Sequence, residues 1–179
     1  IHHLNDLQQM KETVSATRSF AAPISLVVRE LDSSGMLDIV VEESGKIFIS
    51  TELGGGGFVR PKTLSIAENG IRNILRHFEI LPNNNETVSE TRFMETPEKG
   101  GYLMSPKDGL YEPLIELGEK VNKGQIIGRL HSLTEIDSPA LEISSKIEGI
   151  LVMKAGRTSV KLWDTVAVIA SDFDVSVFE

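Results

Sequence analysis

Two different hydrophobic patterns divide this chain. In the first part, apolar residues recur at helical spacing over Asn5 to Ser19 and over Lys62 to Ile80. Short runs of β-branched and aromatic residues, Ala22 to Val28 and Lys46 to Thr51, predict strands. A turn at Leu31 to Met36 leads into a short helix or irregular connection that ends near Gly45. Alternating helices and strands predict an α/β sheet with helical crossovers.

The second part contains an internal repeat of short strands. Gly109 to Leu130 and Gly149 to Ile169 start 40 positions apart, and each reads as a strand, a glycine turn and a closing apolar strand. Two such halves can bury one shared core, which predicts a small β barrel. A polar, Asn-rich stretch separates the two patterns. We therefore predict three segments, with residues 1–81 in an α/β domain, 82–92 as a linker and 93–179 as the barrel.

The candidate chemistry lies at the end of the predicted strand 46–51. Glu52 is followed by Leu53 and then by four glycines, Gly54 to Gly57. Glycines adopt positive φ and let a ligand approach the backbone, so Gly54 and Gly55 are candidate substrate-binding positions. Arg60 could meet a substrate carboxylate, although an arginine after a loop is more often solvated. A phosphate loop would need Gly-Lys-Ser/Thr here, whereas Phe58 follows. The alternative is a glycine turn beside a solvated Glu52.

Composition removes several function classes. The chain has 179 residues, 40% of them hydrophobic, and a net charge of −8 without a basic stripe, which argues against nucleic acid and anionic membranes as partners. It has no cysteine, so thiol chemistry and disulfides are excluded, and this fits a cytoplasmic protein. No apolar run is long enough to span a bilayer. The absence of an initial Met is consistent with a fragment.

The four histidines offer no strong metal-binding pattern. His2 and His3 are adjacent and would point to opposite faces of a strand, and His3 with Asp6 forms only a weak His-x-x-Asp pair. His77 and His131 have no His or acidic partner at a convincing ligand spacing. We predict no metal ligands within this chain.

The segment from Gly45 to Gly57, with its Thr51-Glu52-Leu53-Gly54-Gly55 core, and the segment Ala67 to Leu75 resemble the succinylglutamate desuccinylase/aspartoacylase family, in particular its N-acetyl-diaminobutyrate deacetylase-like branch. This resemblance implies a zinc-dependent amidohydrolase with a zinc-carboxypeptidase-like α/β domain and a β barrel-sandwich domain of the biotinyl/lipoyl type. It gives Glu52 the catalytic role of acting on the zinc-bound water. It also implies that the zinc ligands, a His-x-x-Glu pair and a second His, lie upstream of Ile1.

The resemblance therefore predicts the C-terminal half of a deacylase that removes an acyl group from a small N-acylated amino acid. We expect the chain to be inactive alone and the complete protein to be cytoplasmic, with homo-oligomer formation possible. The competing hypothesis is a non-enzymatic binding or oligomerisation module. A prosthetic-group carrier fits less well, because the hairpin between the repeats has no lysine and Lys154 lies inside the second repeat.

Overall fold

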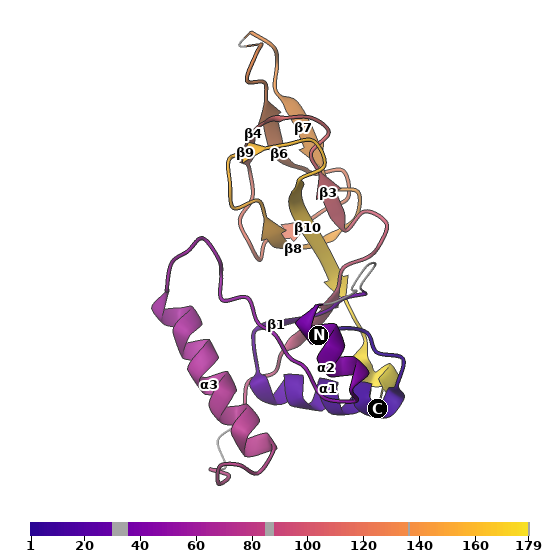
Figure 1. Cartoon of the computed structure of the whole chain (residues 1–179). Helices are drawn as coiled ribbons and strands as arrows, with labels where there is room; N and C mark the ends of the chain where they lie inside the picture. The colour runs from indigo at the N-terminus through magenta and orange to yellow at the C-terminus, as the bar shows by residue number, and fades with distance from the viewer. Residues whose placement is uncertain (30–35, 85–87, 136, 179) are drawn as a thin grey trace. The chain divides into compact units, whose positions relative to one another are not determined.

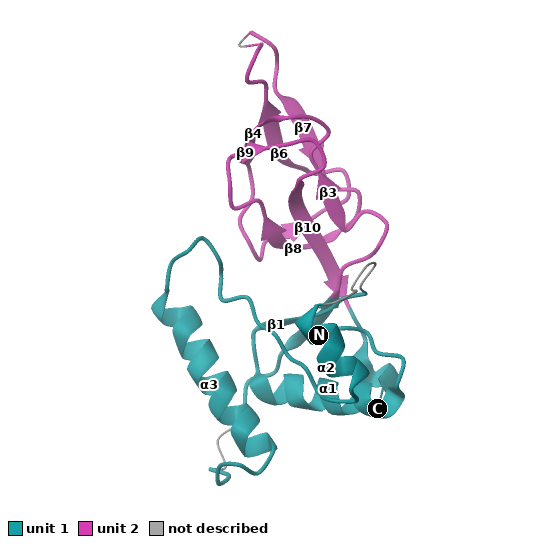
Figure 2. Cartoon of the chain, in the orientation of Figure 1, with its two compact units in different colours: residues 1–94, 173–179 teal, residues 95–172 magenta. Residues whose placement is uncertain are grey.

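The computed structural model describes residues 1–29, 36–84, 88–135 and 137–178 and shows a mixed α and β fold (Figure 1). It divides into two compact units (Figure 2). Unit 1 comprises residues 1–94 together with 173–179, and unit 2 comprises residues 95–172. The predicted turn at 31–36 lies outside the described residues except for Met36.

Unit 1 contains the helices and the first strands. Its elements are α1 (Leu7–Phe20), β1 (Ile24–Val27), α2 (Leu37–Glu43), α3 (Pro61–His77), β2 (Arg92–Glu95, which ends at the junction) and the 3-10 helix η1 (Val175–Phe178). The two long helices and the strand over 22–28 confirm the sequence pattern. Helix α1 begins at Leu7, two residues later than predicted, because the Asp6 carboxylate accepts a hydrogen bond from the Gln9 amide, at 2.9 Å, and caps it.

Helix α3 begins at Pro61, whose fixed φ suits the first helical position. It ends at His77, three residues earlier than predicted and before Pro82 is reached. Glu79 adopts a left-handed φ of 58°, and the amide of Ile80 then bonds back to the carbonyl of Leu75 at 2.8 Å. A backbone cap, rather than the proline, ends this helix.

The predicted strand 46–51 is wrong for the described chain, because these residues have no regular secondary structure. A strand is defined by its backbone partners, and within the described residues no neighbouring strand forms a ladder with this segment. Its first residue is held by other contacts: the Lys46 carbonyl accepts a hydrogen bond from the side-chain amide of Gln9, at 2.8 Å.

The core of unit 1 joins both ends of the chain. Met10 and Val14 of α1 pack with Val27, Phe93 and Val175, and all five are buried. The sequence analysis assigned residues 173–179 to the barrel, whereas they pack in unit 1. The amide of Phe173 donates to the carbonyl of Phe93 at 3.0 Å, so the chain leaves unit 1 and re-enters it at neighbouring positions.

The regular secondary structure in the described part of unit 2 is all strand. They are β3 (Tyr102–Met104), β4 (Gly109–Pro113), β5 (Lys120–Val121), β6 (Ile126–His131), β7 (Leu141–Ser144), β8 (Gly149–Lys154), β9 (Ser159–Val160) and β10 (Thr165–Asp172). Within this unit they pair in two sets of four, β7-β6-β4-β9 and β3-β10-β8-β5. Each set takes two strands from the first half of the unit and two from the second, so the two halves interlock.

The repeat predicted from the sequence is present in the strands and also in equivalent hydrogen bonds of the two halves. Strands β3 to β6 recur as β7 to β10 about 40 positions later. Ser105 and Ser145 are both buried, and each hydroxyl donates to the carbonyl two residues ahead, at 2.7 Å to Lys107 and 2.6 Å to Ile147. These paired turns precede Gly109 and Gly149, the first residues of β4 and β8. The two halves therefore share both strand order and turn chemistry.

A single core lies between the two sets of strands. It draws on both repeats and is built from Leu103, Tyr111, Val121, Ile127, Leu130, Ile143, Leu151, Val160, Val166, Ala167 and Ile169. Strand β10 is the most deeply buried, with five consecutive buried residues from Val166 to Ala170.

Candidate functional site

The glycine-rich loop has the backbone that its sequence predicts. Gly54, Gly55, Gly56 and Gly57 have φ values of 93°, 67°, 75° and 72°, all in the left-handed region that side chains disfavour. A substitution at any of them would be strained. Four consecutive residues of this kind turn the chain sharply between the segment 46–51 and helix α3. Glu52 stands at the entrance to this turn.

Glu52 is exposed, as are all its neighbours from Thr51 to Arg60. Within the described residues it forms no hydrogen bond or ion pair. A carboxylate with free oxygens on an exposed turn is able to accept a proton from water, and no part of the described chain encloses it. Among the described residues, Glu52 is therefore open to solvent.

Arg60 lies at the other end of the loop, at the start of α3. It is the N-cap residue, with φ −113° and ψ 135°, and its carbonyl accepts hydrogen bonds from the Leu64 amide at 2.9 Å and the Thr63 hydroxyl at 3.0 Å. A Cβ on Gly54 would lie 3.6 Å from Cγ2 of Thr63, so the loop folds back toward the first turn of the helix. In the described structure no hydrogen bond or ion pair joins the side chains of Arg60 and Glu52. The two residues share a loop but do not yet form a site.

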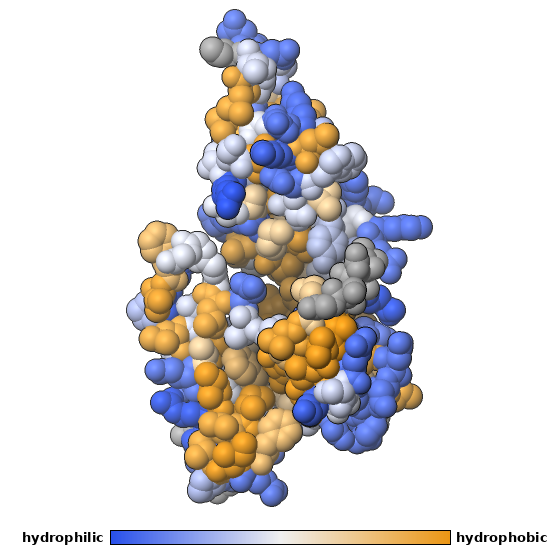
Figure 3. Space-filling model, in the orientation of Figure 1, coloured by the Kyte–Doolittle hydropathy of each residue, from blue (hydrophilic) through white to orange (hydrophobic). Residues whose placement is uncertain are grey.

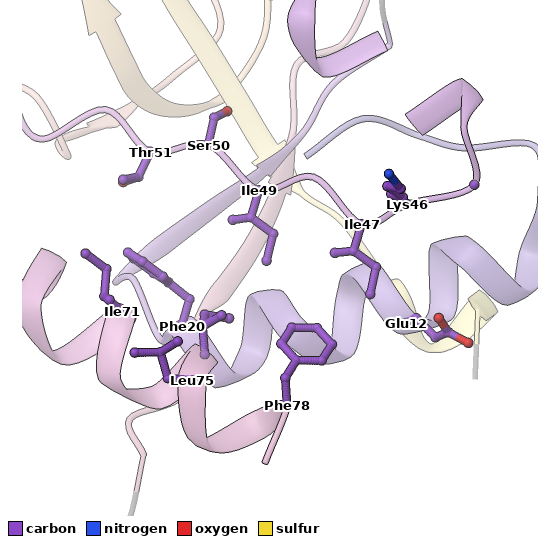
Figure 4. A pocket seen from close by; sticks show the side chains of 12 residues that line it. Glu12, Phe20, Lys46, Ile47, Ile49, Ser50, Thr51, Ile71, Leu75 and Phe78 are labelled. Carbon is purple, nitrogen blue, oxygen red and sulfur yellow. The ribbon is translucent and has the colours of Figure 1, made fainter. Parts of the chain in front are cut away.

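A groove leads up to this loop. It has a volume of about 560 Å³ and lies between residues 45–51, the end of α1 and one face of α3. Figure 4 shows Ile47 and Ile49 pointing toward the helices, opposite Ile71, Leu75 and Phe78. Ser50 and Thr51 line the end of the groove that continues into Glu52. Most of the groove is apolar, but Glu12 and Lys46 also line it, and Ser50 and Thr51 line it next to the candidate catalytic residue.

A partly buried histidine–carboxylate cluster lies elsewhere in unit 1. The Nδ1 atom of His2 is 2.8 Å from Oε2 of Glu42, and its Nε2 atom is 3.7 Å from Oδ2 of Asp38. The Glu42 side chain is only 4% exposed. The sequence analysis missed this cluster because 36 or more residues separate His2 from the two carboxylates.

Of the candidate pairs considered from the sequence, His3 and Asp6 are engaged elsewhere. Asp6 caps α1, and His3 packs its ring against Phe178 with centroids 5.4 Å apart. His77 lies 2.9 Å from the Ser19 hydroxyl, and His131 lies 2.8 Å from Glu112. In the described parts of the chain, no three His, Cys, Asp or Glu side chains are grouped so that they could hold a metal ion. No helix among the same residues is long and apolar enough to cross a membrane.

Comparisons with known proteins show which protein family this chain is similar to. Residues 1–78 match the model of the succinylglutamate desuccinylase/aspartoacylase catalytic domain. The N-alpha-acetyl-L-2,4-diaminobutyric acid deacetylase of Halomonas elongata is 35% identical over 170 residues, which are 94% of this chain and 50% of that protein. The chain belongs to the succinylglutamate desuccinylase/aspartoacylase family.

Solved structures of relatives share the fold described above. A succinylglutamate desuccinylase/aspartoacylase from Rhodobacter sphaeroides superposes with a TM-score of 0.88 at 31% identity, covering 97% of this chain and 53% of that one. The product-bound ectoine utilization protein EutE (DoeB) from Ruegeria pomeroyi gives 0.89 at 35% identity, covering 95% and 52%. The chain therefore spans about half the length of the family members it matches, and it matches their C-terminal half.

Proposed function

We propose that this chain is the C-terminal half of a deacylase that hydrolyses a small N-acylated amino acid, with Glu52 as its proton shuttle. The observation that carries the proposal is the position of Glu52, directly before four glycines in left-handed conformation and at the end of a groove. The relative from Halomonas elongata, named as a deacetylase of an N-acetylated diamino acid, supports the substrate class.

The proposed reaction is the hydrolysis of an amide. A water oxygen attacks the acyl carbon, and Glu52 accepts the proton that this water loses. When the carbon–nitrogen bond breaks, Glu52 passes the proton to the leaving nitrogen, so the products are a free amine and a carboxylic acid, which then loses the water's second proton to solvent and becomes a carboxylate. Gly54 and Gly55 would let the substrate lie close to the backbone, and Arg60 would pair with its carboxylate.

The family resemblance further implies zinc as the cofactor. The described residues do not fit a zinc site of their own, since they offer no group of three ligands. We therefore propose that the ligands belong to the other half of the family's chain.

The finer domain description is also part of the proposal. We propose that unit 1 is the latter part of a zinc-carboxypeptidase-like domain, which fits the family match to residues 1–78. The interlocked repeats of unit 2 support a barrel-sandwich fold of the biotinyl/lipoyl type. We further propose a cytoplasmic protein, with a homo-oligomer possible for the whole enzyme.

The test uses a fusion in which the N-terminal half of the Halomonas elongata deacetylase precedes Ile1. With N-alpha-acetyl-L-2,4-diaminobutyric acid as substrate, Glu52→Gln should lower kcat by about 100- to 10,000-fold, the usual range for loss of a general base, while the bound metal content stays the same. Glu68→Gln is the matched control, since Glu68 is an exposed glutamate on α3. Near-normal turnover of Glu52→Gln would refute the role, and turnover by the unfused chain would refute its predicted inactivity.

A further inference from the structure

The two halves of unit 2 contain the same tight turn, but they differ at its third residue. Residues 122–125 follow β5, and residues 161–164 follow β9. In each turn the amide of the fourth residue donates to the carbonyl of the first at 3.0 Å. The third residue has a left-handed φ in both turns, and it is Gly124 in the first, at 82°, and Trp163 in the second, at 72°.

The tryptophan is not explained by the folding of this turn. A left-handed third residue is the mark of a type II turn and favours glycine, because a side chain there is strained. The hydrogen bond of the third amide is the same in both halves, from Gly124 to Ser145 at 2.8 Å and from Trp163 to Ser105 at 2.9 Å. Trp163 is nevertheless 72% exposed, and Leu162 beside it is 47% exposed. A strained and exposed side chain of this size indicates a binding role.

A cationic depression adjoins the same turn. It has a volume of about 700 Å³ and is lined by residues of β8, the loop after it, β9 and the turn, among them Lys154, Arg157 and Lys161. The carboxylate of Asp164, which also lines it, accepts a hydrogen bond from the amide of Lys161 at 2.8 Å. The depression is therefore positively lined, in a chain whose net charge is −8.

The equivalent loop of the first half has the opposite charge. Residues 114–119 join β4 to β5 and include Glu116 and Glu119, both exposed. Leu114 and Leu117 of this loop are 41% and 46% exposed. Because the two halves share one fold, packing does not require this reversal of charge. An acidic loop with apolar side chains is complementary to a cationic depression beside a tryptophan.

The acidic loop and the cationic depression lie side by side. Lys154 lines the depression, and its Nζ atom is 2.6 Å from Oε2 of Glu116. A twofold axis passing between them would place the loop of each copy on the depression of the other, as in a closed, self-complementary dimer. The visible face of unit 2 is largely hydrophilic, with hydrophobic residues in small groups (Figure 3). A dimer formed by such a surface relies on a few apolar anchors within a charged rim.

We propose that two copies of this chain associate through unit 2, with the acidic loop 114–119 of each copy docked on the cationic depression and Trp163 of the other. The leucines of the loop pack against the indole. Glu119 faces Lys161 and Arg157 of the second copy. This inference depends neither on the reaction proposed above nor on the family of the chain.

The chain contains its own probe of this contact, because Trp163 is its only tryptophan. Tryptophan fluorescence and sedimentation velocity are recorded on the full 179-residue chain over a range of concentrations. As the concentration rises, we expect dimers to form and the emission to move to shorter wavelength, since docking removes the indole from water. Added salt should weaken the dimer, because it screens exposed charges.

Trp163→Gly separates binding from folding. It should weaken the dimer by about tenfold or more, as for a central aromatic anchor. The Tm of unit 2, followed in the tyrosine band, should rise, because glycine relieves the left-handed strain. Leu133→Gly is the control and should leave the dimer unchanged, since Leu133 is 57% exposed but lies in the loop between β6 and β7.

A charge exchange identifies the occupant as a second copy. Glu119→Lys and Lys161→Glu should each weaken the dimer, because each places like charges across both contacts. In a mixed dimer of the two variants, both contacts again join opposite charges. Native mass spectrometry of an equimolar mixture should therefore show the mixed dimer in excess over either homodimer.

Four results would overturn the inference. The first is a chain that stays monomeric at every concentration, which would assign Trp163 to a different partner. The second is a dimer that Trp163→Gly leaves unchanged, and the third is a mixture without preference for the mixed dimer. The fourth is a lower Tm of Trp163→Gly, which would show that the indole packs within unit 2.

Discussion

Replacing Gly149 by alanine tests whether the interlocked repeats of unit 2 leave any room at the start of β8. The added Cβ would lie 2.8 Å from Cγ2 of Ile169 and 3.0 Å from the carbonyl carbon of Ala170, with the carbonyl oxygen of Ala170 closer still. Real Cβ atoms do not approach heavy atoms below 3.0 Å. Since Ile169 and Ala170 are fully buried on β10, the partner strand cannot move aside.

The magnitude follows from two opposing effects. Overpacking a well-packed core typically costs about 1–3 kcal/mol, and contact with backbone rather than a mobile side chain places this variant in the upper part of that range. Removing glycine from the unfolded chain restores about 0.4–1 kcal/mol. The net destabilisation is about 2 kcal/mol. For a unit of this size, each kcal/mol lowers Tm by about 4–8 °C, so we expect a decrease of about 8–16 °C.

Near-ultraviolet circular dichroism follows unit 2 alone. Both tyrosines, Tyr102 and Tyr111, and the single tryptophan, Trp163, lie in unit 2, whereas all seven phenylalanines lie in unit 1. A melting curve recorded in the tyrosine and tryptophan band therefore reports the unfolding of the β unit. Gly156→Ala is the control, because its Cβ would meet nothing within 4 Å.

The reasoning would be refuted if Gly149→Ala and Gly156→Ala melted at the same temperature as the unaltered chain. Gly109→Ala extends the test to the first repeat, where the added Cβ would lie 2.6 Å from the carbonyl oxygen of His131. A loss comparable to that of Gly149→Ala is expected if the two halves are equivalent in packing as well as in strand order.

Two further predictions concern the boundary between the units and the buried tyrosine. Excising residues 95–172 and joining Met94 to Phe173 by a short glycine linker should leave the far-ultraviolet helical signal of unit 1, because Phe93 and Phe173 are hydrogen-bonded neighbours. Deleting residues 93–179 should instead abolish this helical signal, since Phe93 and Val175 belong to the core of unit 1. Burial raises the pKa of Tyr111, so the folded state holds its proton more tightly than the unfolded chain does. Stability from this group is complete below the unfolded pKa of about 10 and is lost as pH rises from there through the raised pKa of the folded state. In an absorbance titration of tyrosinate, the ionisation step at the highest pH should be present in the unaltered chain and absent in Tyr111→Phe. The same high-pH step in both proteins would contradict its assignment to Tyr111.

Local pattern was sufficient for much of the fold. The apolar spacing of α1 and α3 predicted both helices, because a helix satisfies its own backbone hydrogen bonds. The 40-residue repeat was visible in the spacing of Gly109 and Gly149 and recurs in the strands of unit 2. The glycine loop followed from composition as well, since only glycine adopts four successive left-handed conformations without strain. These features depend on residues close together in the chain.

Contacts between distant residues were decided only by the tertiary structure. Residues 46–51 have strand composition but no ladder, because a strand needs a partner that composition cannot supply. The return of Val175 to the core of unit 1 and the pairing of His2 with Glu42 likewise join segments that no local pattern connects. For the candidate site, the sequence determined the residue types, Glu52 and its glycines. The tertiary structure decided that they stand open beside an apolar groove, because enclosure requires a second layer of protein and not a motif.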